Sequence, residues 1–165
     1  MNFVSIQDTS KETIDAFDCG SDELNEFIRK YAKQNDKKDI GKTFVCTEDD
    51  HIIGYYTLSN AQIMFENTPK ELSKGLPKYP IPCIRIARLA IDRRFQNEGY
   101  GSSLLKNALL KIVRLSEHTG IYFIIVDAKE SSASFYEHYG FIRLNMGNLT
   151  YIIPVSTVRK AIVNH

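Results

Sequence analysis

The segment RLAIDRRFQNEGYGSSLLKNALL, residues 88–110, joins an alternating apolar stretch to an amphipathic helical pattern through a loop with two glycines. Backbone N–H groups at a helix N-terminus lack partners within the helix, and the helix dipole favours an anion there. A side chain at Gly99 or Gly101 would keep phosphate oxygens from these donors or forbid a turn with positive φ. The junction therefore predicts a pyrophosphate site, with Arg94 and Gln96 as further donors at its rim, or else a tight turn before a helix.

The loop does not match the familiar nucleotide-binding motifs. No Lys-Ser or Lys-Thr pair follows the glycines as in a P-loop, and no complete GxGxxG precedes a downstream acidic residue. The chain also has no Ser/His/Asp or Cys/His arrangement for nucleophilic catalysis. A phosphate-bearing ligand of another kind is therefore expected.

Length and composition favour a single domain over residues 1–165. The hydrophobic content of 43% and the charged content of 25% are ordinary for a globular protein, and the formal charge of +1 gives no overall attraction to nucleic acid or anionic membrane. Any basic surface must therefore be local.

The three cysteines, Cys19, Cys46 and Cys83, have neither CxxC spacing nor a histidine at metal-ligand spacing. We expect no metal, and the odd count fits a reducing cytoplasm better than a disulfide framework. The N-terminal residues lack the pattern of a signal peptide, and no apolar run approaches the ~20 residues of a membrane span. We therefore expect a cytoplasmic protein without membrane insertion.

Apolar periodicity predicts an α/β (α+β) chain with the element order β-α-β-β-(loop)-β-α-β-α-β-β. Asp49-Asp50 is expected to form the turn of a hairpin, and four prolines between residues 65 and 82 predict a loop with at most a short helix. Gly120 and Gly140 are expected to end helices, and a turn with Asn145 and Gly147 to separate the last two strands. The strands are expected at 3–7, 42–48, 51–63, 83–92, 121–128, 141–144 and 150–155, and the helices at 21–35, at about 102–119 and at 132–139.

Two segments together resemble the GCN5-related N-acetyltransferases. They are RIARLAIDRRFQNEGYGSSLL, residues 85–105, and IYFIIVDAKESSASFYEHYGFIRL, residues 121–144. The acetyl-CoA signature of that family, Gln/Arg-x-x-Gly-x-Gly/Ala, stands here as Gln96-Asn97-Glu98-Gly99-Tyr100-Gly101. The resemblance implies that family's fold, a mixed central sheet of about six or seven strands flanked by about four helices. In this fold two central parallel strands splay apart and the cofactor enters the wedge.

The resemblance also implies acetyl-CoA as the acyl donor and assigns its contacts. The backbone of the loop would cradle the CoA pyrophosphate, and the preceding strand would present backbone groups to the pantetheine arm and the acetyl carbonyl. The implied cofactor-binding residues are Leu89, Ala90, Ile91, Gln96, Asn97, Glu98, Gly99, Tyr100, Gly101 and Ser102.

Enzymes of this family let an amine attack the thioester directly, so no protein nucleophile is needed. The position of Tyr136 in SFYEHYGF matches the family's Phe-Tyr motif, which implies that its hydroxyl is the general acid that protonates the leaving thiolate. Without the resemblance, a packing role for this aromatic residue is the simpler interpretation. Glu130 stands where many relatives have an asparagine that contacts pantetheine, and no histidine occupies a motif position, so the base stays unassigned.

Residues 17–35, 42–59 and 80–92 resemble the acetyltransferase toxins of toxin–antitoxin modules. This resemblance implies that the chain acetylates the amino group of aminoacyl-tRNA and blocks translation. It also implies an antitoxin partner and a homodimer. Binding to tRNA needs local cations, because phosphate neutralisation supplies most of the affinity. The candidates are Arg29, Lys33, Lys37, Arg85, Arg88 and Arg93.

Two alternatives remain open at the level of the sequence. The first is an acetyltransferase for a small-molecule or protein amine, which would use the same cofactor-binding residues. Helix 21–35 and the proline-rich loop would then form a different acceptor cleft. A non-catalytic acyl-CoA-binding module would bind CoA without turnover. The last residues, STVRKAIVNH, form either a short helix available to a partner or a tail.

Overall fold

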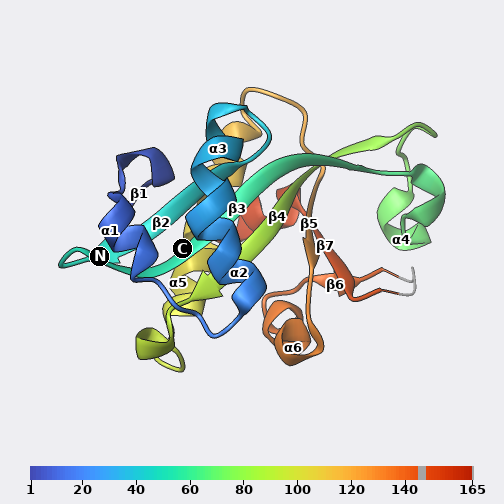
Figure 1. Cartoon of the computed structure of the whole chain (residues 1–165). Coiled ribbons are helices and arrows are strands. Elements are labelled where there is room, and N and C mark those ends of the chain that lie inside the picture. Colours follow the sequence, from blue (N-terminus) through green and yellow to red (C-terminus); the bar gives the residue numbers. More distant parts are fainter. Residues whose placement is uncertain (145–147, 165) are drawn as a thin grey trace. The chain divides into compact units, whose positions relative to one another are not determined.

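The computed structural model describes residues 1–144 and 148–164, whose seven strands are hydrogen-bonded in the order β1-β2-β3-β4-β5-β7-β6 (Figure 1). This mixed sheet confirms the predicted fold class. The strands are β1 Asn2–Ser5, β2 Lys42–Glu48, β3 His51–Ile63, β4 Ile81–Ile91, β5 Phe123–Asp127, β6 Ile142–Arg143 and β7 Thr150–Pro154.

The three helices predicted at 21–35, about 102–119 and 132–139 are present, and three further helices, α1, α4 and α7, accompany them. The helix predicted at 21–35 consists of α2, a π-helical turn and α3, and Ser21 caps it by accepting the Leu24 N–H at 3.4 Å. Helix α1 was not predicted, because its five residues bury only Ile14. The helices are α1 Lys11–Asp15, α2 Asp22–Glu26, the π turn Phe27–Tyr31, α3 Ala32–Lys37, α4 Lys70–Ser73, α5 Tyr100–Leu115, α6 Glu130–His138 and α7 Val155–Val163.

The chain divides into two compact units, each built from two segments. The first unit contains residues 1–59 and 87–108, and the second contains residues 60–86 and 109–165. Strands β3 and β4 and helix α5 contribute residues to both. The expectation of a single domain over residues 1–165 stays a prediction.

In the first unit β1, β2 and β3 form an antiparallel sheet with a tight hairpin between β2 and β3. Asp49 and Asp50 have φ of 50° and 62°, which is the type I′ geometry that the twist of a two-residue hairpin requires. The predicted hairpin is therefore confirmed.

The core of this unit centres on Tyr55, whose ring centroid lies 5.4 Å from that of Phe17 and 6.3 Å from that of Phe27.

In the second unit β4 runs parallel to β5, with paired residues from Cys83↔Phe123 to Ile86↔Val126, and β7 pairs antiparallel with β5 and β6. The first four residues of β5 are buried, as expected for a central strand covered on both faces. Pairing of β4 with β5 stops at Ile86, but β4 continues to Ile91. This geometry agrees with the splayed parallel strands that the resemblance implies.

The two glycines predicted to end helices behave differently in the structure. Gly140 follows α6 with φ of 89° and donates its N–H to the Glu137 carbonyl, as predicted. The prediction for Gly120 is wrong, because α5 ends at Leu115 and Gly120 is not among the residues with positive φ. The apolar periodicity already stops at Val113, so the helix loses its packing face before it reaches the glycine. The turn predicted with Asn145 and Gly147 lies outside the described residues.

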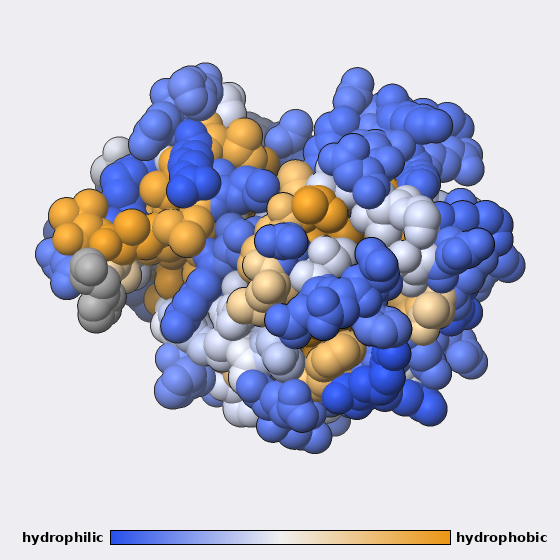
Figure 2. Space-filling model, turned by 90° about the vertical axis from the view of Figure 1, so that its left-hand side faces the viewer, coloured by the Kyte–Doolittle hydropathy of each residue, from blue (hydrophilic) through white to orange (hydrophobic). Residues whose placement is uncertain are grey.

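The surface is mostly hydrophilic and carries separate hydrophobic patches (Figure 2). Ile40 in the first unit and Tyr79 and Val163 in the second are exposed large apolar side chains. No helix in the described part of the chain has the length and apolar composition needed to span a membrane.

Candidate active site

The loop between β4 and α5 turns twice through the left-handed region of backbone conformation. Asn97 has φ of 63° and Gly99 has φ of 85°, and α5 begins at the next residue. An added Cβ at Gly99 would meet no heavy atom within 4 Å, so the positive φ, and not crowding, explains the glycine. Residues 96–99 are exposed, and Gly101 lies in the first turn of the 16-residue helix α5. The backbone predicted to bind an anion therefore lies in exposed or half-buried residues, and the anion site itself stays a prediction.

The predicted contacts to pantetheine lie at the end of β4. Ala90 packs its side chain into the core of the first unit, while Leu89 and Ile91 are half-buried. Gly54 on β3 passes so close that an added Cβ would lie 2.6 Å from the Ala90 carbonyl oxygen and 2.8 Å from Cδ1 of Ile91. Only a glycine at position 54 lets β3 run this close to the predicted cofactor strand.

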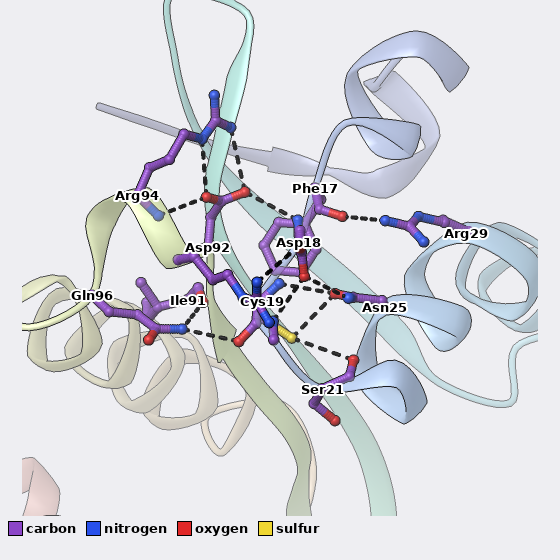
Figure 3. A network of polar contacts seen from close by, with 12 residues as sticks. Phe17, Asp18, Cys19, Ser21, Asn25, Arg29, Ile91, Asp92, Arg94 and Gln96 are labelled. Atoms are coloured by element: carbon purple, nitrogen blue, oxygen red, sulfur yellow. Dashed lines mark hydrogen bonds and ion pairs between the residues drawn. The ribbon is translucent and has the colours of Figure 1, made fainter.

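Asp92 anchors the start of the loop (Figure 3). Its side chain follows β4 directly and is only 2% exposed. Oδ1 accepts the Arg94 N–H at 2.9 Å and Nε of Arg94 at 3.0 Å, and Oδ2 accepts the Asp18 N–H at 3.1 Å and Nη2 of Arg94 at 3.3 Å. Burial alone would raise the pKa of Asp92, but these hydrogen bonds outweigh it and hold the pKa below its ordinary value. The carboxylate is thus ionised and fully engaged.

The network continues into the segment before α2 (Figure 3). The Asp18 carboxylate accepts Nδ2 of Asn25 at 2.8 Å and the Gly20 N–H at 2.9 Å, and these bonds hold the pKa of Asp18 below its usual range. The Arg93 N–H donates to the Asp18 carbonyl at 2.8 Å. Nε2 of Gln96 donates to the Cys19 carbonyl at 3.0 Å. The chain before α2 is therefore joined to the loop at several points.

These bonds change the role predicted for Arg94 and Gln96. Arg94 directs its guanidinium to Asp92, and Nε2 of Gln96 also donates to the Ile91 carbonyl at 2.9 Å. Both side chains therefore brace the loop, and their role as further donors at its rim stays a prediction. The backbone N–H groups of the loop and of the first turn of α5 remain the predicted phosphate donors.

Tyr136 belongs to the second unit, on helix α6, and is 7% exposed. Its ring makes edge contacts with Phe135 at 5.2 Å and Phe141 at 5.5 Å between centroids. Burial raises the pKa of its hydroxyl to about 12, so the group is a neutral proton donor near pH 7. Among the described residues, no side-chain hydrogen bond to this hydroxyl is present, so its proton is not committed to a described side chain.

Three of the predicted cations, all in the first unit, contact residues between Phe17 and Phe27. Nη2 of Arg29 donates to the Phe17 carbonyl at 2.6 Å, the Arg88 guanidinium lies 3.5 Å above the ring of Phe27, and Arg93 lies 3.8 Å from the Asp18 carboxylate. Lys33 and Lys37 are on α3, where Lys37 is exposed. Arg85 lies in the second unit, where it pairs with Asp127.

Several residues of this site were missed in the sequence. Asp92 carried a local signal, because an aspartate after a strand and before a turn is a preferred cap. Asp18 and Asn25 carried none that links them to residue 92, since their role depends on a contact across 74 positions. Gly54 was missed because a glycine inside a β-rich run does not reveal which strand approaches it.

The chain belongs to the GNAT family of acetyltransferases. The model of the acetyltransferase (GNAT) domain matches residues 39–143, which include the loop, the end of β4 and Tyr136. The family resemblance inferred from the sequence is therefore confirmed.

Several known proteins are similar to this chain over most of its length. A tRNA-acetylating toxin of Mycobacterium tuberculosis (strain ATCC 25618 / H37Rv) is 30% identical over 131 residues, which are 79% of this chain and 78% of the relative. The structure of AtaT complexed with acetyl-methionyl-tRNAfMet is 26% identical with a TM-score of 0.88, and covers 98% of both chains. The structure of AtaTR bound with AcCoA is 26% identical with a TM-score of 0.83, and the match covers 98% of this chain and 97% of that one.

Proposed function

We propose that this protein transfers the acetyl group of acetyl-CoA to the α-amino group of an aminoacyl-tRNA, as the toxin of a toxin–antitoxin module. One geometric observation supports acetyl-CoA as the donor. The loop from Asp92 to Tyr100 has positive φ at Asn97 and Gly99 and ends at the N-terminus of α5. The acceptor is supported by the similarity to the mycobacterial tRNA-acetylating toxin over most of both chains.

The cofactor is assigned to the residues named in the sequence. The backbone from Gln96 to Ser102 binds the pyrophosphate, where N–H groups and the helix dipole favour negative charge. Leu89, Ala90 and Ile91 continue β4 past its last residue paired with β5, so β5 does not use their backbone groups, and we assign these groups to the pantetheine arm and the acetyl carbonyl. The Ile91 carbonyl already accepts a hydrogen bond from Nε2 of Gln96. Acetyl-CoA supplies an activated thioester.

The chemistry needs proton handling and no protein nucleophile. The amine nitrogen attacks the thioester carbonyl, the new C–N bond forms and the nitrogen loses one proton to water. The C–S bond breaks and the sulfur takes up a proton. Tyr136 is the proposed donor, because it holds the position of the family's Phe-Tyr motif and its raised pKa keeps it protonated. The pKa of an α-amino group is roughly 7.7–8.0, so a useful fraction is neutral at physiological pH and a strong base is unnecessary.

The tRNA phosphates are assigned to Arg29, Lys33, Lys37, Arg88 and Arg93 in the first unit and to Arg85 in the second. Positive charge near α2 and α3 supports this assignment, although the formal charge of the chain is only +1. We further propose a cytoplasmic location, a cognate antitoxin protein and a homodimer, as the resemblance to toxins of this class implies.

The test is transfer of labelled acetyl from acetyl-CoA to total aminoacyl-tRNA, run beside a panel of small amines. Tyr136→Phe removes the proposed acid and keeps the ring, so turnover should fall about 100-fold or more with acetyl-CoA affinity unchanged. Tyr139→Phe is the matched control, since it removes a hydroxyl from the same aromatic cluster. Label only in small amines would favour a small-molecule acetyltransferase, and CoA binding without any transfer would favour a non-catalytic module.

A further inference from the structure

A cavity of about 390 Å³ lies within the second unit, a size typical of pockets for small ligands. Residues from the end of β3, the middle of β4, the end of β5 and the start of β7 line it. Ile63, Met64 and Ile125 supply apolar wall, and Arg85, Asp127 and Thr150 supply polar groups. Ile63 and Ile125 also belong to the core of this unit, so the apolar part of the wall is fixed by packing.

The polar wall is an ion pair held in place by a hydroxyl. The Asp127 carboxylate accepts a hydrogen bond from Nη1 of Arg85 through Oδ2 and one from the Thr150 hydroxyl at 2.9 Å through Oδ1. The Arg85 side chain is 32% exposed and that of Asp127 is 58% exposed, so both charged groups can be reached by a ligand. Because each charge faces its opposite, the cavity presents polar atoms without net charge.

The cavity lies where the two central parallel strands stop pairing. The last paired residues are Ile86 and Val126, and Asp127 is the next residue of β5. Ligands of open α/β sheets bind outside the carboxyl ends of such strands. The helix that carries Tyr136 begins at Glu130, three residues after Asp127.

We propose that this cavity receives the side chain of the amino acid whose α-amine is acetylated, and that the Arg85–Asp127 pair restricts it to uncharged side chains. The inference rests on the proposed function. A cationic side chain would enter beside Arg85 and find Asp127 already neutralised. An anionic side chain would meet the Asp127 carboxylate and would have to break the pair to reach Arg85. Apolar or amide side chains fit the buried isoleucines and the polar groups at the wall.

The experiment uses one tRNA body charged by an acylating ribozyme with Met, Leu, Gln, Lys or Glu, so that only the side chain differs. For the full chain we expect kcat/KM at least tenfold higher for the uncharged amino acids than for Lys or Glu. Arg85→Met leaves the Asp127 carboxylate without its cation and should raise the Lys-to-Met ratio of kcat/KM at least tenfold. Asp127→Asn should raise the Glu-to-Met ratio by a similar factor.

Controls separate side-chain selection from loss of folding. Lys11→Met removes a cation from the exposed Lys11–Asp15 pair on α1 and should change neither ratio. Arg85→Lys keeps the charge and should retain the wild-type order, even if Arg85→Met does not fold. Thermal unfolding and acetyl-CoA binding identify the variants that are folded.

Two results would overturn the inference in distinguishable ways. If the wild-type chain acetylates aminoacyl-tRNA and the ratios stay unchanged in folded Arg85→Met and Asp127→Asn, the pocket assignment is wrong and the proposed function stands. If the wild-type chain acetylates none of the five charged tRNAs while it acetylates small amines, the proposed function fails and this inference fails with it.

Discussion

Asp92→Asn tests whether the buried network in Figure 3 positions the cofactor loop or only stabilises the fold. The substitution keeps the size of the side chain, but an amide has one acceptor oxygen where the carboxylate has two. The NH₂ group must then face either the Arg94 N–H and Nε, which bond Oδ1, or the Asp18 N–H and Nη2 of Arg94, which bond Oδ2. Two of the four hydrogen bonds are lost in either orientation.

The expected magnitude follows from that count. A hydrogen bond to a charged group contributes about 1.5 kcal/mol or more, so two of them amount to roughly 3 kcal/mol in the free energy of unfolding. About half of this loss, ~1.4 kcal/mol, would appear as a tenfold weaker Kd for acetyl-CoA if the variant frees the loop locally. We expect urea denaturation to show the first effect and isothermal titration with acetyl-CoA to show the second.

Asp36→Asn is the matched control for this prediction. Asp36 is 6% exposed in the same unit, and its carboxylate accepts Nε2 of Gln7 and the Thr43 N–H, each at 3.3 Å. None of these partners belongs to the cofactor loop, so this variant should lose stability and keep its affinity for acetyl-CoA. If folded Asp92→Asn also binds acetyl-CoA with the wild-type Kd, the network has only a structural role and our reasoning is refuted.

Three further substitutions or conditions test the fold around the site. Gly54→Ala should cost about 2–3 kcal/mol in urea denaturation and weaken acetyl-CoA binding, because its Cβ would press on the Ala90 carbonyl; unchanged values would show that β4 shifts freely. Gly99→Ala places a Cβ in open space at φ of 85°, so only backbone strain of roughly 1 kcal/mol is expected, or about 2–4 °C in Tm, and a much larger loss would contradict that account. Burial raises the pKa of Cys46 and Cys83 to about 11 and that of Tyr136 to about 12, while the unfolded groups ionise near pH 9 and 10. Their stabilisation is therefore complete below pH 9 and is lost as the pH rises to 12, so the free energy of unfolding should fall steadily above pH 9 and a flat profile would argue against it.

Local patterns in the sequence predicted the parts of the fold that local geometry determines. The Asp49-Asp50 turn follows from the tolerance of aspartate for positive φ, and the strand, loop and helix around Gly99 follow from periodicity and glycine placement. The failure at Gly120 has the same origin. Glycine permits a helix to end but does not require it, and the end at Leu115 depends on where the apolar face stops packing.

The contacts that give the candidate site its chemistry could not be predicted in this way. Asp92 meets Asp18 across 74 positions, and Arg85 meets Asp127 across 42. Each pair combines charged residues of common types, and no spacing in the sequence marks them as partners. Their positions depend on which strands lie side by side, a property of the whole sheet.

The same contacts decide how much of the predicted positive charge is available to nucleic acid. Arg29 donates to a backbone carbonyl, whereas Arg85 and Arg93 face the carboxylates of Asp127 and Asp18. A phosphate that approaches Arg85 or Arg93 must compete with an intramolecular carboxylate, so these two arginines add less to nonspecific attraction than their number suggests. Lys37 on α3 is exposed, as phosphate binding requires. Under the proposed function, a chain of formal charge +1 would gain affinity for tRNA where the substrate's geometry matches these groups, which favours selection of one acceptor over indiscriminate binding.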